Sequence, residues 1–174
     1  MRVYLAHGAS GGVETVQPWV KALAARGLEA RAVGLPRSSA ERALPVYREL
    51  IETDARANGS NATTDFVIGG HSFGGRVASM LAAEQPLRGL VLLSYPLHRP
   101  GHSERLRTEH WPQIGCPVLL LSGESDPFAR IELMRAAVKA LPSASLLTYP
   151  RVGHGLTPVR DEAADRIAEF VNGL

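Results

Sequence analysis

The feature that most constrains the fold is a short apolar segment that runs directly into a glycine-rich turn. The segment is Phe66-Val67-Ile68-Gly69, which is typical of a buried β-strand, and the turn has the pattern Gly70-x-Ser72-x-Gly74. Helix-forming residues follow from Arg76 to Ala83. A serine on so sharp a strand-to-helix turn has a strained backbone, and side chains two positions before and after it would collide unless both are glycine. The pattern therefore predicts a serine hydroxyl displayed at a helix N-terminus, where free N–H groups favour negative charge.

Apolar strand-like runs alternate with amphipathic helical patterns along the whole chain. The continuous hydrophobicity of the strands suits a parallel sheet covered on both faces. Together with right-handed crossovers, the alternation predicts an α/β fold of three layers around a doubly wound, mainly parallel sheet of six strands. The expected strands are Arg2–His7, Glu29–Gly34, Asp65–Gly69, Leu90–Ser94, Val118–Ser122 and Ser145–Tyr149. The expected helices lie near Gly12–Arg26, Ala40–Ala57, Gly74–Glu84, Phe128–Leu141 and Pro158–Val171.

Length and composition fit one globular domain over residues 1–174. The net charge of +2 is mild and the basic residues are scattered, which argues against a nucleic-acid partner. Cys116 is the only cysteine, so no internal disulfide can form, and we expect a buried thiol and a reducing, cytoplasmic location. The first residues do not resemble a signal peptide, and no apolar run is long enough to span a membrane.

Two further side chains fit the chemistry of an activated serine. A serine hydroxyl needs a base that accepts its proton and a third group that orients the base. Asp126 follows the strand that ends at Ser122, and His154 follows the strand that ends at Tyr149. Because catalytic groups of doubly wound folds gather at the carboxyl ends of strands, we expect Ser72, Asp126 and His154 to form a catalytic triad.

Each partner also has a simpler interpretation. Asp126 precedes Pro127 and is placed to cap a helix that starts near Phe128. Glu124 is a rival for the acid, although Asp126 lies closer to the helix start and has the shorter side chain. His154 stands between two glycines, as a loop histidine without a function also can.

A second group of histidines lies in an irregular segment, Pro96 to Pro117, which interrupts the alternation of strands and helices. The segment follows a strand, where either a substrate lid or a surface excursion is expected. His98, His102 and His110 stand in it, yet no cysteine or carboxylate pattern completes a metal site. We therefore expect no metal.

The chain resembles the α/β-hydrolase superfamily over essentially its whole length. Within it, the sequence is similar to a small branch without a cap domain, related to dienelactone hydrolase. True dienelactone hydrolases carry cysteine at the position of Ser72, so the resemblance favours an ordinary serine esterase. It also implies six strands in the spatial order 2-1-3-4-5-6, without the usual first two strands. The segments that carry it are His7-Gly8, Gly70-His71-Ser72-Phe73-Gly74, Ser94-Tyr95-Pro96-Leu97-His98, Gly123-Glu124-Ser125-Asp126-Pro127-Phe128 and Gly153-His154-Gly155.

Family geometry implies an oxyanion hole, which binds the negative oxygen of the reaction intermediate. Its donors are the N–H groups of Phe73, directly after the serine, and of Ala9, in the loop His7 to Gly12, with Ser10 as the second choice in that loop. His7 is expected to shape this loop and not to act as a base. The loop's glycines match neither the dinucleotide fingerprint nor a P-loop, so we expect no nucleotide cofactor.

The expected activity is hydrolysis of carboxylic esters with small or short acyl groups, through an acyl-enzyme and without a cofactor. Two alternatives remain: a non-catalytic binding or assembly module with an unused triad, and a thioesterase or small peptidase. The strand Glu29–Gly34 is expected at a sheet edge, which a homodimer would cover. The candidates for attracting an acidic substrate are Arg37, Arg99 and Arg130. The expected substrate-binding residues are Ser10, Tyr95, Leu97, Phe128 and Leu156.

Overall fold

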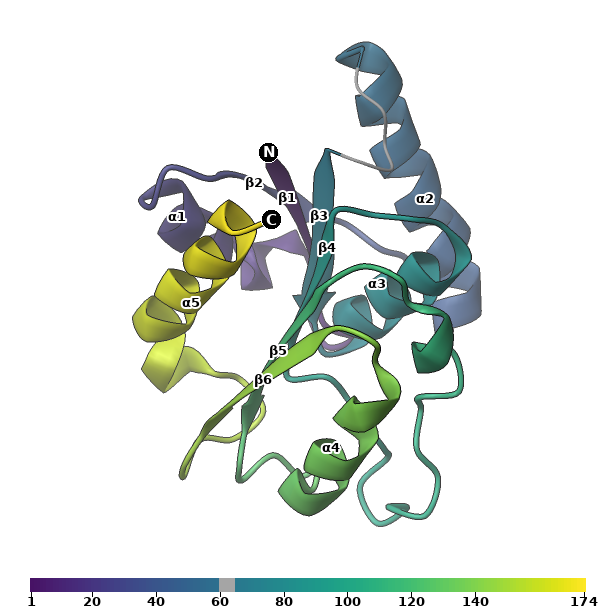
Figure 1. Cartoon of the computed structure of the whole chain (residues 1–174), viewed down its shortest axis with the longest axis vertical. Coiled ribbons are helices and arrows are strands. Elements are labelled where there is room, and N and C mark those ends of the chain that lie inside the picture. Colours follow the sequence, from purple (N-terminus) through teal and green to yellow (C-terminus); the bar gives the residue numbers. More distant parts are fainter. Residues whose placement is uncertain (60–64) are drawn as a thin grey trace.

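The computed structural model describes residues 1–59 and 65–174, and in this part of the chain six strands form one parallel sheet (Figure 1). The strand order is β2-β1-β3-β4-β5-β6, and every neighbouring pair is parallel. The predicted fold class and strand order are therefore confirmed. The strands are β1 (Arg2–Ala6), β2 (Glu29–Val33), β3 (Phe66–His71), β4 (Gly89–Leu93), β5 (Val118–Gly123) and β6 (Ala144–Tyr149).

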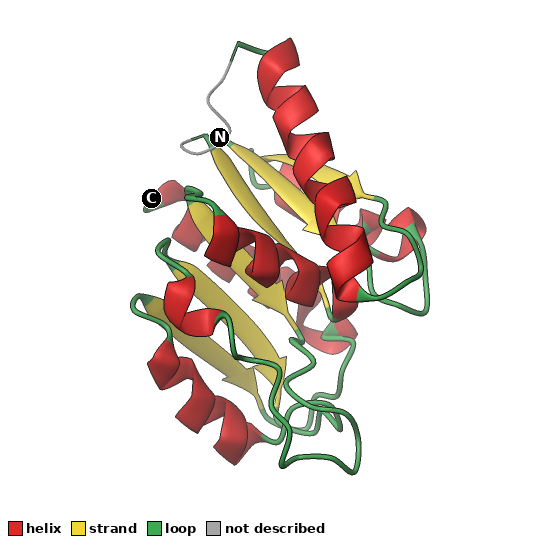
Figure 2. Cartoon of the chain, turned by 90° about the vertical axis from the view of Figure 1, so that its right-hand side faces the viewer, coloured by secondary structure: helices red, strands yellow, loops and turns green. Residues whose placement is uncertain are grey.

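Helices cover both faces of the sheet, which makes three layers. On one face lie α1 (Gln17–Ala24) and α5 (Arg160–Asn172), which pack against each other. On the other face lie α2 (Ala40–Ala57), α3 (Phe73–Glu84) and α4 (Ile131–Ala137), in front of the strands in Figure 2. Right-handed crossovers place α1 on one face and α2 and α3 on the other, because the chain moves from β1 to β2 in one direction and from β2 to β3 and β4 in the opposite one.

The sheet separates two hydrophobic cores, and alternate residues of each strand enter opposite ones. In β1, Val3 and Leu5 pack into the core beneath α1 and α5, whereas Tyr4 and Ala6 pack into the core beneath α2 and α3. Because residues on both faces are buried, the strands read as continuous apolar runs in the sequence. Cys116 lies buried in the second of these cores, and burial raises the pKa of its thiol to about 11.

Two helices are shorter than the sequence pattern indicates. The first regular α-helical turn after the loop of residues 8–12 begins only at Gln17, after a short 3₁₀ turn at Val13–Thr15. The expected helix from Phe128 begins at Ile131 instead. The Asp126 carboxylate accepts the Phe128 N–H at 2.8 Å, and this bond closes a separate turn ahead of the helix. Residues 128–130 therefore belong to the loop that carries Asp126.

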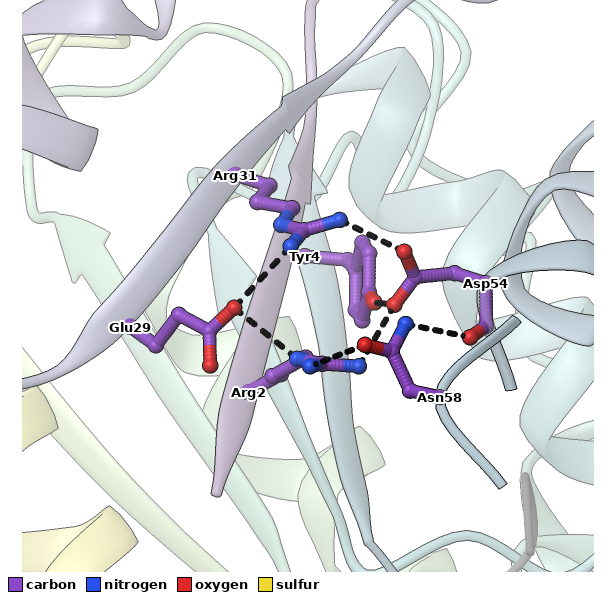
Figure 3. Close-up of polar contacts among 6 residues, drawn as sticks. All are labelled: Arg2, Tyr4, Glu29, Arg31, Asp54 and Asn58. Carbon is purple, nitrogen blue, oxygen red and sulfur yellow. Dashed lines mark hydrogen bonds and ion pairs between the residues drawn. The ribbon is translucent and has the colours of Figure 1, made fainter. Parts of the chain in front are cut away.

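The edge strand β2 carries charged side chains along its exposed positions, among them Glu29 and Arg31. These side chains join a group at the amino ends of β1 and β2 and the last turns of α2 (Figure 3). We call this group the amino-end network; it consists of Arg2, Tyr4, Glu29, Arg31, Asp54 and Asn58. Charged residues on an edge strand discourage pairing with another sheet, so the edge has protection of its own, and a dimer across it stays a prediction.

No helix within the described ranges combines the length and the apolar composition needed to cross a membrane.

Candidate active site

Ser72 lies on the sharp turn between β3 and α3, with a left-handed backbone angle φ of 51°. The glycines on either side allow the turn because the backbone segments touch. A Cβ atom on Gly70 would lie 2.6 Å from the Gly74 carbonyl carbon, and one on Gly74 would lie 2.5 Å from the Ala6 carbonyl oxygen. The Ser72 N–H donates to the Leu93 carbonyl at 2.8 Å and so ties the turn to β4. A strained residue held this firmly points to function.

The structure brings Ser72, His154 and Asp126 together from three different loops. His154 Nε2 lies 2.8 Å from the Ser72 hydroxyl oxygen, and His154 Nδ1 lies 2.7 Å from Asp126 Oδ2. The Asp126 side chain is fully buried, whereas about a quarter of the His154 side chain remains exposed. The carboxylate is therefore positioned to hold the proton on Nδ1 and to leave Nε2 facing the serine.

The simpler interpretations of the acid do not match the contacts. Asp126 does not cap α4, whose N-cap residue is Arg130. Its Oδ1 accepts the Phe128 N–H, which leaves Oδ2 for His154. Glu124 turns elsewhere: it accepts a hydrogen bond from Thr148 and pairs with Arg135.

Gly123, the last residue of β5, lets the loop that carries Asp126 pack against the loop that carries His154. A Cβ atom at Gly123 would lie 2.2 Å from the Val152 carbonyl oxygen. The Ser125 N–H donates to the same carbonyl at 2.9 Å. The two loops are thus joined through their backbones, a role for Gly123 that the sequence pattern does not reveal.

Phe73 and Ala9 line the cleft beside Ser72, as does Ser10. Within the described part of the chain, neither the Phe73 nor the Ala9 N–H donates to another backbone group. His7 is buried and holds the loop in shape: its Nε2 accepts the Leu35 N–H at 3.1 Å, and its Nδ1 donates to the Gly8 carbonyl at 2.7 Å. With both ring nitrogens engaged, His7 is unsuited to act as a base.

His71, the last residue of β3, supports the loop position of His154. Its Nε2 donates to the backbone carbonyl of His154 at 2.9 Å, and the two rings lie 5.1 Å apart. Burial lowers the pKa of His71, so the ring is neutral near pH 7 and keeps this tautomer. Phe128 packs on His154 with its ring centre 4.6 Å away. This role of His71 is not predicted by the sequence pattern, in which its position beside Ser72 is the available signal.

The cleft over Ser72 has a volume of about 620 Å³. Of the expected substrate-binding residues, Ser10 and Phe128 line it. Further lining comes from residues 38–41, where the chain leaves β2 and enters α2, and from three arginines, Arg76, Arg99 and Arg107. The carboxyl ends of all parallel strands share one edge, which is the signal that would have pointed to residues 38–41. Arg37 and Arg130, proposed together with Arg99, lie on the surface outside this lining.

Three expected substrate-binding residues are instead buried in the cores, and their assignment is corrected. Tyr95 packs edge-on against Trp111, with ring centres 5.1 Å apart, and Leu97 lies in the same core. Leu156 lies in the core beneath α1 and α5. Their positions just after strand ends predicted nearness to the serine, but the chain turns inward at each of them, and burial of apolar surface decides the direction.

The loop histidines have separate partners. His98 is buried, donates from Nδ1 to the Arg99 carbonyl and accepts the Arg130 N–H at Nε2. His110 Nε2 lies 2.7 Å from the Ser79 hydroxyl. Among the described residues, no three histidine, cysteine or acidic side chains are grouped as a metal site.

Comparison with known protein families agrees with this geometry. The sequence model of the alpha/beta hydrolase domain family matches residues 1–171. The chain belongs to the alpha/beta hydrolase domain family. The resemblance expected from the serine turn, the acid loop and the base loop is therefore confirmed.

Solved structures of other α/β-hydrolases share the fold at low sequence identity. Est1E from Butyrivibrio proteoclasticus, with ferulic acid bound, is 15% identical at a TM-score of 0.84, with 99% of this chain and 88% of that chain covered. The monoacylglycerol lipase of Paleococcus ferrophilus is 16% identical at a TM-score of 0.79, with 97% of this chain and 93% of that chain covered. An alpha-beta serine hydrolase homologue from Coxiella burnetii is 16% identical at a TM-score of 0.81, with 98% of this chain and 84% of that chain covered.

Proposed function

We propose that this α/β-hydrolase family member is a serine hydrolase that cleaves carboxylic esters with small or short acyl groups. The observation that supports the proposal most is the continuous hydrogen-bonded chain from the buried Asp126 through His154 to Ser72, with heavy-atom distances of 2.7 and 2.8 Å. Both distances lie within the reach that proton transfer requires.

In the proposed reaction, Ser72 attacks the ester carbonyl while His154 Nε2 takes the hydroxyl proton. The new bond joins the serine oxygen to the acyl carbon, and the carbonyl oxygen becomes negative. His154 then gives the proton to the leaving alcohol, and the acyl group stays on Ser72. A water molecule, deprotonated by His154, repeats the sequence and releases the acid. Asp126 stabilises the imidazolium that forms twice in this cycle.

The N–H groups of Phe73 and Ala9 are the proposed donors to the negative oxygen. Phe73 is the first residue of α3, so its N–H points out of the helix start and the helix dipole adds to its effect. Each such donor contributes on the order of 3 kcal/mol in the transition state.

The size of the cleft supports a small substrate. A volume of about 620 Å³ lies within the range of sites for small molecules. Est1E was solved with ferulic acid bound, and another relative in fold is a monoacylglycerol lipase. The first protein binds a carboxylic acid, and the second is named for acylglycerols, which are esters. Both agree with an ester as the proposed substrate class.

The test is hydrolysis of short-chain 4-nitrophenyl esters by wild type and by Ser72→Ala, together with labelling of both by a fluorophosphonate probe. We expect the wild type to be labelled and active, and the variant to lose labelling and at least 10⁴-fold in kcat/KM with its fold intact by circular dichroism. A variant near the wild-type rate would end the assignment of Ser72.

Two other outcomes have definite meanings. Labelling without ester turnover would indicate an assembled site with another acyl donor, and a panel of thioesters and amides would then separate a thioesterase from a peptidase. A folded wild type that neither labels nor turns over any member of the panel would favour the non-catalytic binding module.

A further inference from the structure

Three arginine side chains converge on the cleft that holds Ser72. Arg76 comes from the first turns of α3, and Arg99 and Arg107 come from the loop between β4 and β5. Arg99 and Arg107 also line an adjoining hollow of about 300 Å³, together with Arg105. These two residues therefore stand where the cleft and the hollow meet.

The loop that carries two of these arginines is anchored in the core. The Arg107 N–H donates to the Leu97 carbonyl at 2.8 Å, and the Tyr95 hydroxyl donates to the Arg107 carbonyl at 2.5 Å. Next to Arg99, the His98 N–H donates to the Phe128 carbonyl at 3.0 Å. The guanidinium groups thus extend from backbone positions that are held in place relative to the cleft.

Positive charge exceeds negative charge at this end of the cleft. Arg76 pairs with Glu41 at 3.3 Å, and its buried Nε has no hydrogen-bond partner among the described residues. Within the same part of the chain, no carboxylate lies within ion-pair distance of Arg99 or Arg107. Glu109 lines the adjoining hollow without pairing with them.

Arg107 shows the energetic consequence of this arrangement. Its burial, together with the nearby charges of Arg76 and Arg99, lowers the pKa of its guanidinium group. The guanidinium stays charged at any physiological pH, so the lowered pKa reports an unfavourable environment for that charge. A bound anion would offset the part of this cost that comes from the repulsion by Arg76 and Arg99.

We infer that Arg99 and Arg107, with Arg76 beside them, form a subsite for an anionic group of the substrate. The natural ester would then carry a carboxylate or a phosphate apart from the bond that is cleaved. Guanidinium groups suit both anions because their N–H donors match two oxygens at once. This inference rests on the proposed function, since it assigns a substrate class to the same site.

The experiment compares esters that differ in one charge. On the acyl side, mono-4-nitrophenyl adipate is matched with 4-nitrophenyl hexanoate. On the alcohol side, 4-carboxyphenyl hexanoate is matched with 4-carbamoylphenyl hexanoate, which is neutral and has the same single ester bond. We expect the wild type to favour the anionic member of at least one pair by about tenfold in kcat/KM, which corresponds to roughly 1.4 kcal/mol. The pair that shows the preference identifies the side of the substrate that carries the charge.

Arg99→Gln and Arg107→Gln should each lower the ratio of anionic to neutral kcat/KM severalfold, mainly through KM for the anionic ester. Arg37→Gln and Arg130→Gln are matched controls, because they remove the same charge from surface positions outside the cleft lining. A ratio near one in the wild type for both pairs would overturn the inference. So would an equal fall of the ratio in the control variants, which would indicate general electrostatic attraction.

A binding measurement separates this inference from the proposed function. Calorimetric titration with adipate and with inorganic phosphate does not depend on turnover, and the tighter ligand identifies the preferred anion. We expect binding to the wild type that weakens about tenfold in Arg107→Gln. If neutral esters are hydrolysed but neither anion binds, the proposed function stands and the anionic subsite is wrong. If anions bind but no ester is hydrolysed, the subsite stands and ester hydrolysis is wrong.

Discussion

Two polar clusters lie at opposite ends of the same sheet, and they differ in how completely their charges are matched. At the amino ends of β1 and β2, Asp54 accepts from Arg2 at 2.9 Å, from Arg31 at 2.5 Å and from the Tyr4 hydroxyl (Figure 3). At the carboxyl ends, Ser72 stands on a strained turn and faces an open cleft of about 620 Å³. Arg99 and Arg107 line this cleft without a carboxylate partner among the described residues, whereas Arg76 pairs with Glu41. Tyr4, Arg31 and Asp54 of the first cluster also line a hollow of about 570 Å³, but their polar groups are paired with one another. The second cluster leaves charges unpaired in its cleft.

The difference shows why a group of charged residues is not by itself a site. The amino-end network contains acids, bases and a tyrosine within hydrogen-bond distance, yet its donors and acceptors are directed at one another. The carboxyl-end cluster contains the proposed nucleophile Ser72 and the proposed base His154, which contact each other and line the open cleft, so a substrate can reach the serine oxygen from the cleft. A functional site needs polar groups that the fold leaves available to a substrate.

The largest expected difference between the clusters is catalytic. Asp126→Asn should lower kcat for a neutral ester by on the order of 10⁴-fold, because an amide neither fixes the Nδ1–H tautomer nor stabilises the imidazolium. Steady-state kinetics on a folded, purified variant measure this. Glu124→Gln is the matched control, since Glu124 stands in the same loop but binds Thr148 and Arg135. A larger loss in the control would show that the acid has been misassigned.

The strained turn gives the next largest effect, on stability. Gly74→Ala would place a methyl group 2.5 Å from the Ala6 carbonyl oxygen, a backbone atom that cannot rotate away. We expect the free energy of unfolding in urea to fall by about 3 kcal/mol. In Gly115→Ala the added methyl group meets no heavy atom within 4 Å, so that control should change stability by less than about 0.5 kcal/mol. Equal effects of the two substitutions would argue against close packing at the turn.

The smallest expected effect concerns the amino-end network. Burial alone would raise the pKa of Asp54, but the hydrogen bond from Tyr4 and the charges of Arg31 and Arg2 outweigh it and lower the pKa. The ionised form is therefore favoured in the folded state, so its contribution is present above the ordinary aspartate pKa of about 3.9 and is lost as pH falls below it. Asp54→Asn should cost about 1 to 2 kcal/mol of unfolding free energy at pH 7.

Urea unfolding at pH 7 and at pH 3 tests the direction of the Asp54 pKa shift. The difference between wild type and Asp54→Asn should shrink at the lower pH, and ester turnover at pH 7 should not change. Glu49→Gln removes a carboxylate from an exposed position of the same helix and should have little effect at either pH. A difference that grows at pH 3 would contradict the lowered pKa.

Positions that depend on local backbone contact were predicted correctly from the sequence, whereas the directions of side chains after strand ends were not. Gly70 and Gly74 were predictable because only backbone contact explains both positions, and the strand order followed from the family resemblance. Tyr95, Leu97 and Leu156 were assigned to the cleft wrongly, since nearness to a strand end does not determine whether a side chain turns outward. The shortened α4 was missed because the hydrogen bond that the Phe128 N–H donates to the Asp126 carboxylate competes with helix propensity.

The sequence by itself determined the βα alternation, the serine turn and the three residues proposed as the triad. These depend on local periodicity, on glycine at sites of backbone contact and on the rule that parallel strands place their carboxyl ends at one edge. Only the tertiary structure decided that Gly123 joins two loops, that His71 holds the carbonyl of His154 and that Arg76, Arg99 and Arg107 share one cleft. Each of these depends on the distance between segments that are remote in the chain, and no local pattern carries that distance.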